Sequence, residues 1–90
     1  MISNNPFEEL RKKADEVRDI ELTVLLQHFG STKDHQDKAK WHTSQGVISV
    51  NGQKFINWTR GTGGGGAIDL IIHLQGIGFK DAVQWLHNHF

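Results

Sequence analysis

Residues 61–66 of the chain are five glycines and one threonine, the composition most suggestive of a phosphate site. Gly61, Gly63 and Gly66 satisfy the G-x-G-x-x-G spacing that cradles a pyrophosphate in dinucleotide-binding folds. That chemistry requires a parallel βαβ unit, with another strand after the helix. Here a predicted hairpin precedes the glycines and two predicted helices follow them. A P-loop is also excluded, because no Lys-Ser or Lys-Thr pair ends the run.

Two interpretations of the glycine-rich loop remain open. Gly63, Gly64, Gly65 and Gly66 admit positive φ and carry no side chains, so they suit a tight strand-to-helix crossover where a Cβ would collide with the sheet. The same bare backbone could present N–H groups to a phosphate or another polyanion at a helix N-terminus. Asp69, in the first turn of that helix, is expected to cap backbone N–H groups.

Six histidines and ten acidic residues raise the possibility of a metal or catalytic site. Neither H-x₃-H nor H-E-x-x-H occurs, and the chain has no cysteine, so no metal and no cofactor are expected. Asp34, Asp37 and Asp69 are not paired, and no Ser-His-Asp order with a strained nucleophile turn is present. The chain itself is therefore not expected to be an enzyme.

Trp41 and Trp58 flank a predicted hairpin and have two alternative roles. Buried, they would form the core, and Trp58→Ala would then cost about 3–5 kcal/mol and unfold a small domain. Exposed beside Lys40, Lys54 or Arg60, either one would form a stacking platform with cations, which suits single-stranded nucleic acid.

Two helices are predicted at the start of the chain. Asn5 and Pro6 suit the N-cap and first position of a helix over residues 6–17. Apolar residues at i, i+3, i+4 and i+7 predict a second helix over about 20–29, capped by Asp19 and ended by Gly30. No breaker separates the two helices, so a single continuous helix is an alternative.

The middle and end of the chain predict a small sheet followed by two more helices. Residues 31–39 are polar and charged and are predicted to form a loop. Asn51-Gly52 predicts a two-residue type I′ turn between strands 47–50 and 53–58. Residues 39–43 could add a third strand. Helices are predicted over about 67–75 and 79–90. The fold class is therefore α+β: a small antiparallel sheet with N-terminal helices and two C-terminal helices.

Composition limits the class of protein further. Ninety residues predict one domain, and ten basic residues balance ten acidic ones. Such a chain lacks the overall positive field of a strong nucleic-acid binder, so binding would need local charge. The absence of a signal-like segment or a long apolar run predicts a cytoplasmic protein without membrane contact.

The pattern of the chain over about residues 19–88 resembles the N-terminal zinc-binding domain of bacterial DNA primases. In that family a three- or four-stranded ribbon carries two pairs of zinc ligands and is followed by a Gly-Gly-x-Ala-Ile-Asp segment and a helix with an Ala-Val-x-x-Leu pattern. The similarity is carried by residues 40–44, 47–50, 54–58, 63–66, 67–70 and 79–86.

The resemblance does not extend to the zinc site, because the cysteine ligands are missing from this sequence. The second cysteine pair would fall near Asn57–Gly61 and the first around Lys40–Ser44, where His42 is the one residue able to bind metal. The chain looks still more like cysteine-free relatives in proteins of bacterial mobile elements, often ahead of a primase-type or relaxase-type catalytic domain. Without zinc, the packing of Trp41, Phe55 and Trp58 is expected to hold the ribbon. Residues 1–18 would form a peripheral helix, and residues 19–90 the zinc-ribbon-like domain.

The function implied by the resemblance is a non-catalytic DNA-binding module of DNA replication or mobile-element maintenance. Its expected partners are single-stranded or template DNA and a protein partner or downstream catalytic domain. The alternative is a protein-interaction module that has lost DNA contact. The nucleic-acid-binding surface would comprise Lys40, Trp41, His42, Lys54, Trp58, Arg60, Gly63, Gly64, Gly65 and Gly66.

Overall fold

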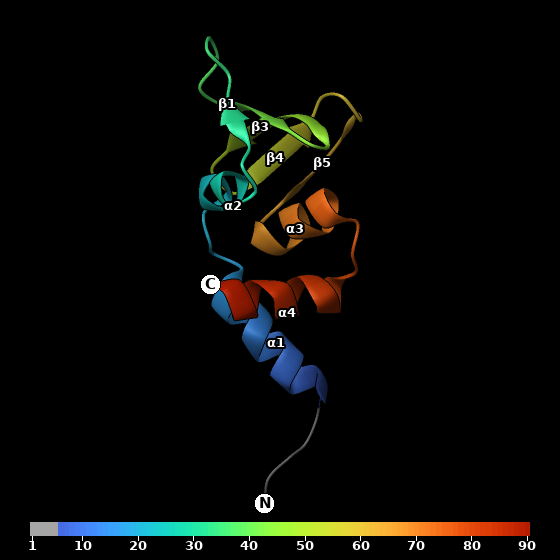
Figure 1. The fold of residues 1–90 in the computed structure, drawn as a ribbon. Helices are drawn as coiled ribbons and strands as arrows, with labels where there is room; N and C mark the ends of the chain where they lie inside the picture. The colour runs from blue at the N-terminus through green and yellow to red at the C-terminus, as the bar shows by residue number, and fades with distance from the viewer. Residues whose placement is uncertain (1–5) are drawn as a thin grey trace, which may run out of the picture.

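The computed structural model describes residues 6–90, which form an α+β domain as predicted. A five-stranded antiparallel sheet in the order β1-β2-β3-β4-β5 lies over the helices. Figure 1 shows the sheet at one end, α2 and α3 beneath it, and α4 and then α1 farther away. The elements are α1 (Pro6–Val17), α2 (Leu22–His28), β1 (Thr32–Lys33), β2 (Lys40–Thr43), β3 (Gly46–Asn51), β4 (Lys54–Asn57), β5 (Thr62–Gly65), α3 (Ala67–Gln75) and α4 (Phe79–His89).

The two N-terminal helices are separate, which decides between the two alternatives. α1 ends at Val17 and α2 begins at Leu22. Glu21 occupies the N-cap position of α2, so the prediction that Asp19 caps this helix is wrong. Gly30 follows α2 with φ +74°, a conformation that glycine adopts readily, and it ends the helix as predicted. The predicted N-cap role of Asn5 lies outside the described residues.

The central hairpin is shifted by one residue from its predicted register. Asn51 pairs with Lys54, so the two turn residues are Gly52 and Gln53 rather than Asn51 and Gly52. Gly52 has φ +60°, whereas Gln53 has negative φ. Glycine with positive φ at the first central position meets the requirement of a type II′ turn, whereas type I′ needs positive φ at both positions.

Two segments predicted as loops contain strands. Thr32–Lys33 pairs with Trp41–His42 and adds a short edge strand to the sheet. Thr62–Gly65 pairs with Lys54–Asn57 and forms the opposite edge, so most of the glycine-rich run is β-strand. Glycine is depleted in strands, which is why sequence propensity could not indicate this pairing.

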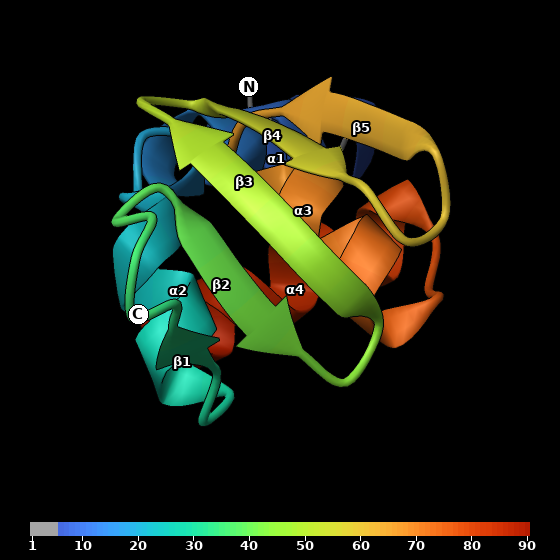
Figure 2. The same cartoon turned by 90° about the horizontal axis from the view of Figure 1, so that it is seen from above.

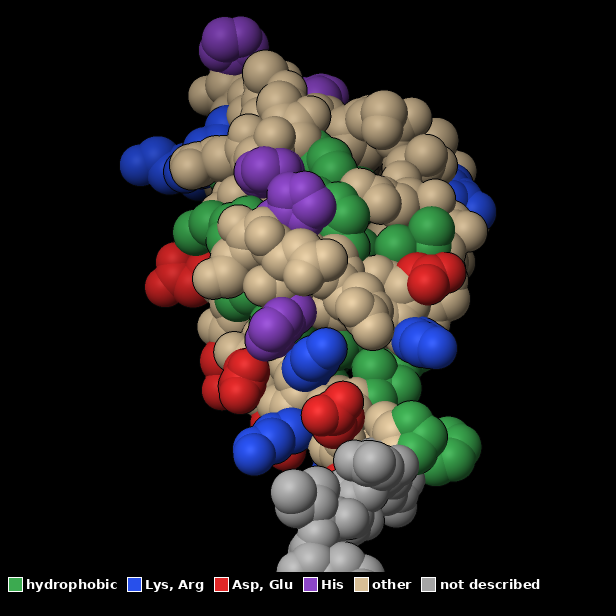
Figure 3. Space-filling view, turned by 60° about the horizontal axis from the view of Figure 1, so that its bottom comes forward, with side chains coloured by type: hydrophobic (Ala, Val, Ile, Leu, Met, Phe, Trp, Pro, Cys, Tyr) green, Lys and Arg blue, Asp and Glu red, His purple; other side chains and the backbone are tan. Residues whose placement is uncertain are grey.

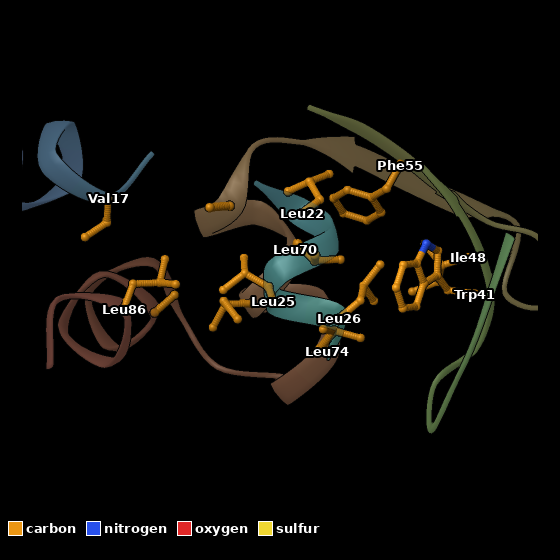
Figure 4. Packing of buried hydrophobic residues seen from close by; sticks show 13 residues of the cluster. Val17, Leu22, Leu25, Leu26, Trp41, Ile48, Phe55, Leu70, Leu74 and Leu86 are labelled. Carbon is orange, nitrogen blue, oxygen red and sulfur yellow. The ribbon is translucent and has the colours of Figure 1, made fainter. Parts of the chain in front are cut away.

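The core lies between one face of the sheet and the helices. Trp41, Ile48 and Phe55 point from the sheet toward Leu26 and Leu70, and the packing continues down to Leu86 and Val17 (Figure 4). α1 packs against α4 and α3 and buries Ala14 and Val17. Among residues 6–90, no helix combines the length and apolar character needed to cross a membrane.

Candidate nucleic-acid interface

Figure 2 looks onto the outer face of the sheet, which the helices leave uncovered. Side chains alternate along each strand, so the residues between the buried ones project from this face. Cross-strand pairing places Lys40, Ser49 and Ile56 in one row and His42, Val47 and Trp58 in the next. The outer face is defined here by Lys40, His42, Val47, Ser49, Lys54, Ile56 and Trp58.

Trp58 is the large aromatic residue of this face. Its side chain is 60% exposed, whereas Asn57, its neighbour in the chain, is buried. The indole Nε1–H donates a 2.7 Å hydrogen bond to Ser49 Oγ on β3, which limits how the ring can turn. Ile56, 47% exposed, lies one position before Asn57 on the same face. The expectation that Trp58 holds the ribbon together from the core is wrong, because this side chain is in solvent.

Two lysines share the outer face with Trp58 and Ile56. Lys54 is exposed on β4, and Lys40 is partly exposed on β2, across the sheet from it. Between residues 31 and 66 the chain carries five Lys or Arg and two Asp, so the sheet is locally basic within a neutral chain. Because the chain as a whole is neutral, nucleic-acid binding would need such a local excess of positive charge.

His42 shares the outer face but already has an anionic partner. Its Nε2 lies 2.8 Å from Asp34 Oδ1 in the loop between β1 and β2. The hydrogen bond from His42, followed by those from the backbone N–H groups of Asp37 and Gln36, lowers the pKa of Asp34 to about 2. Asp34 is therefore a carboxylate near neutral pH and accepts a hydrogen bond from His42. His42 is placed as predicted, but Asp34 offsets part of any positive charge there.

Arg60 lies in the turn between β4 and β5, just beyond Trp58. Its Nη1 donates a 3.3 Å hydrogen bond to Gln45 Oε1 in the turn between β2 and β3. Both turns are also joined through Asn57, whose Nδ2 donates to the backbone oxygen of Gln45 at 2.8 Å. The turn that contains Arg60 is therefore attached to the body of the sheet.

Asn57 is a fully buried polar residue that the sequence did not single out. Its Oδ1 accepts a 3.0 Å hydrogen bond from the Arg60 backbone N–H, and its Nδ2 lies 2.8 Å from His73 Nε2 on α3. Burial and then the Arg60 charge lower the pKa of His73 below its ordinary value of 6.5, and the Asp69 charge partly opposes this shift. An asparagine on the buried side of a strand, where asparagine is depleted, was the available signal.

The four glycines have different roles in the structure. A Cβ on Gly63 would collide with the backbone of Phe55, and one on Gly64 with the Asp69 carboxylate. Gly66 has φ +88°, which side-chain-bearing residues rarely adopt. Gly65 has neither constraint, since the nearest atom, Gln53 O, would lie 3.5 Å from its Cβ.

The amides of Gly65 and Gly66 are already occupied. Gly65 N–H donates to Asp69 Oδ2 at 3.0 Å, and Gly66 N–H donates to Gln53 O at 2.6 Å. Asp69 therefore accepts from one backbone N–H, that of Gly65 on β5 just before the helix, whereas the prediction placed its partners in the first turn of the helix. Of the two interpretations of the glycine-rich loop, these contacts favour the structural one at Gly65 and Gly66, because a carboxylate and a carbonyl oxygen already accept the hydrogen bonds that a phosphate would need.

Trp41 is the other predicted contact that the structure corrects. It is 2% exposed and packs in the core below β2, so it cannot stack on a nucleic-acid base. Lys33 Nζ lies 5.5 Å from the centroid of its ring, over the edge of the sheet. The structure therefore brings together Lys40, His42, Lys54 and Trp58 on the outer face, adds Arg60 at its end, and excludes Trp41.

A second aromatic cluster lies far from the outer face, where α2 and α4 end. Trp85 stacks on His89 at 4.3 Å and on Phe29 at 5.2 Å, and His28 meets Phe90 edge-on at 5.4 Å. Figure 3 shows histidines spread over one face of the molecule, with Lys or Arg and Asp or Glu side chains interspersed toward its lower end. Among residues 6–90, no three acidic or histidine side chains gather as a metal site.

Comparisons with known proteins identify a similar segment in a longer protein. The chain is 38% identical over 82 residues to a protein named "65 kDa protein" from Zymomonas mobilis subsp. mobilis. The match covers 89% of this chain and 14% of that protein, so the chain spans about a seventh of the relative's length. No protein-family model and no solved structure matches the chain.

Proposed function

We propose that this domain binds single-stranded nucleic acid through the outer face of its sheet and acts as a non-catalytic module of DNA replication or mobile-element maintenance. The observation that carries the proposal is Trp58, an exposed indole held against Ser49 on a face that also carries Lys40 and Lys54. A base stacks on an indole whatever its sequence, and Lys or Arg side chains contact the phosphates beside it. The resemblance to the primase zinc-binding domain supports the same partner, template DNA.

The geometry favours a single strand over a duplex. Stacking on Trp58 requires an unpaired base whose flat side is accessible, which a double helix does not offer. Lys54 and Arg60 lie before and after Trp58 along the chain, so cations are available on either side of the stacked base. The chain would thus contribute binding, while catalysis would belong to a partner or a neighbouring domain.

A fluorescence-anisotropy titration with a short labelled single-stranded oligonucleotide at low salt tests the proposal. Stacking contributes about 1–3 kcal/mol per base, so Trp58→Ala should weaken binding roughly 5- to 150-fold. Lys54→Ala should weaken it less and reduce the slope of log affinity against log salt by about 0.7.

Lys12→Ala is the matched control. It removes the same charge from α1, at the end of the molecule opposite the sheet (Figure 1), and should leave affinity unchanged. Wild-type protein that does not bind, or equal losses in Lys54→Ala and Lys12→Ala, would overturn the proposal.

The alternative function, a protein-interaction module, is favoured by one specific observation: Ile56 and Trp58 together expose apolar surface on one face. Contiguous exposed apolar surface marks many protein-binding sites. Under this alternative the oligonucleotide would not bind, and light scattering would show self-association that Ile56→Asp abolishes.

A further inference from the structure

Two backbone groups determine how the buried Asn57 amide is oriented. The Arg60 N–H can only donate, so the atom 3.0 Å from it must be Oδ1. The Gln45 carbonyl oxygen can only accept, so the atom 2.8 Å from it must be Nδ2. Flipping the amide would set two acceptors against each other at Gln45 and two donors at Arg60.

This orientation determines the state of His73. Asn57 Nδ2 is a donor, so His73 Nε2, 2.8 Å away, must accept the hydrogen bond. A ring nitrogen accepts only when it carries no proton, so His73 is neutral with its proton on Nδ1. Protonation would place an N–H donor against the Asn57 donor, and the amide cannot flip without losing its bonds to both turns.

We propose that Asn57 and His73 form an acid-sensitive latch, in which protonation of His73 breaks the contact with Asn57 and loosens the turn that carries Trp58 and Arg60. The turn depends on Asn57 through the Arg60 N–H bond to Oδ1 and the Gly61 N–H bond to the Asn57 carbonyl oxygen at 2.8 Å. His73 is thus a positioning residue for the outer face and does not itself lie on it.

The groups around His73 set the direction of the pH response. Arg60, from the β4–β5 turn, opposes protonation, and Asp69, from the same helix, favours it. The Phe55 ring, from β4, covers the imidazole at 5.5 Å between centroids. Folding lowers the pKa of His73, so the neutral side chain contributes its full stabilisation of the folded state above pH 6.5. That stabilisation is lost as the pH falls from 6.5 toward the pKa of His73 in the folded state.

The first test follows the ring nitrogens of His73 by ¹⁵N NMR in the whole chain. At about pH 7.5 the spectrum should show an unprotonated Nε2 and a protonated Nδ1. As the pH is lowered toward about 5, the Asn57 side-chain amide resonances should shift as His73 protonates. Hydrogen exchange at the Arg60 N–H, corrected for its intrinsic pH dependence, should accelerate at least about tenfold.

The Ser31 amide provides an internal control for global unfolding. It is bonded to Leu26 O at the end of α2, away from the latch, and its corrected exchange should not change. A protonated Nε2 at neutral pH, or Arg60 exchange that stays constant while His73 titrates, would overturn the proposal on the wild-type protein alone.

His73→Gln provides the conservative variant. Glutamine offers Oε1 as an acceptor to Asn57 and does not titrate, so the acid response of the Arg60 amide should disappear. His35→Gln, which removes an exposed histidine from the β1–β2 loop, should retain it. Equal acid responses in both variants would contradict the latch.

The effect on nucleic-acid binding rests on the proposed function and is measured separately. Oligonucleotide affinity should fall on acidification at least about threefold more in wild type than in His73→Gln, because only the wild-type turn is released. If the wild-type protein does not bind at any pH, both the proposed function and this regulatory role are wrong. The hydrogen-exchange data would still test the latch independently. Binding with identical pH profiles in both proteins rejects the regulatory role alone.

Discussion

The two faces of the sheet differ in whether they bury or expose a tryptophan side chain. Trp41 and Trp58 both lie beside the central hairpin, yet Trp41 is 2% exposed and Trp58 is 60% exposed. Trp41 pairs with Ile48 on the inner side, whereas Trp58 pairs with Val47 on the outer side. Because side chains alternate along strands, a difference of one position in pairing decides between core and solvent.

The polar groups differ between the faces as well. On the inner face the polar side chain of Asn57 is buried and uses its amide to bind two turns and α3. On the outer face the polar groups are cations and a hydroxyl next to an exposed indole. Buried packing is therefore concentrated on the inner face, and exposed aromatic and cationic side chains lie on the outer one.

The largest expected effect is the loss of Trp41. Trp41→Ala should lower the free energy of unfolding by about 3–5 kcal/mol, because it leaves a large cavity between the sheet and the helices. Chemical denaturation followed by circular dichroism measures it. Trp41→Phe should cost less, since no residue among 6–90 accepts a hydrogen bond from the buried Nε1 that it removes. A small loss in Trp41→Ala would contradict the assignment of the inner face as the core.

The two adjacent glycines of β5 provide an intermediate test. A Cβ on Gly64 would meet the Asp69 carboxylate and, at 3.2 Å, the Phe55 ring, so Gly64→Ala should cost about 1–3 kcal/mol. Gly65 pairs with Lys54 on the outer side and has space for a Cβ, so Gly65→Ala should change stability by less than about 0.5 kcal/mol. Equal losses in thermal melts of the two variants would show that the steric difference is not what distinguishes these positions.

Trp58→Ala is expected to affect stability far less than Trp41→Ala. An exposed side chain creates no cavity when truncated, so unfolding free energy should change by less than about 1 kcal/mol, most of it from the bond to Ser49. Urea denaturation would measure this, with an unchanged slope against urea as the control for the compactness of both states. A loss comparable to that of Trp41→Ala would remove the contrast between the two faces.

Much of the fold could be predicted from the chain because local signals agree there. Helices 6–17 and 67–75 have the predicted bounds, since amphipathic spacing and the flanking proline or glycines act within a few residues. The strands of the glycine run and of Thr32–Lys33 could not be predicted, because their pairing partners and not their own composition hold them in the sheet.

The candidate site was predicted only in part. Lys40, His42, Lys54 and Trp58 project from one face as expected, whereas Trp41 does not and two of the glycine amides are occupied. Ser49 and Asn57 were missed, because their roles depend on contacts with Trp58 and His73 across 9 and 16 positions of the chain. At the end of β4, Asn57 makes hydrogen bonds to the β4–β5 turn that follows it and to the β2–β3 turn.

The sequence by itself determined the α+β class, most helix limits, the hairpin and the local concentration of positive charge, because periodicity, turn residues and charge are properties of short segments. Only the tertiary structure decided which tryptophan is exposed, which glycines are required and which histidine meets a buried amide. These outcomes follow from strand register and from the packing of distant segments, where a shift of one residue reverses the face of every side chain.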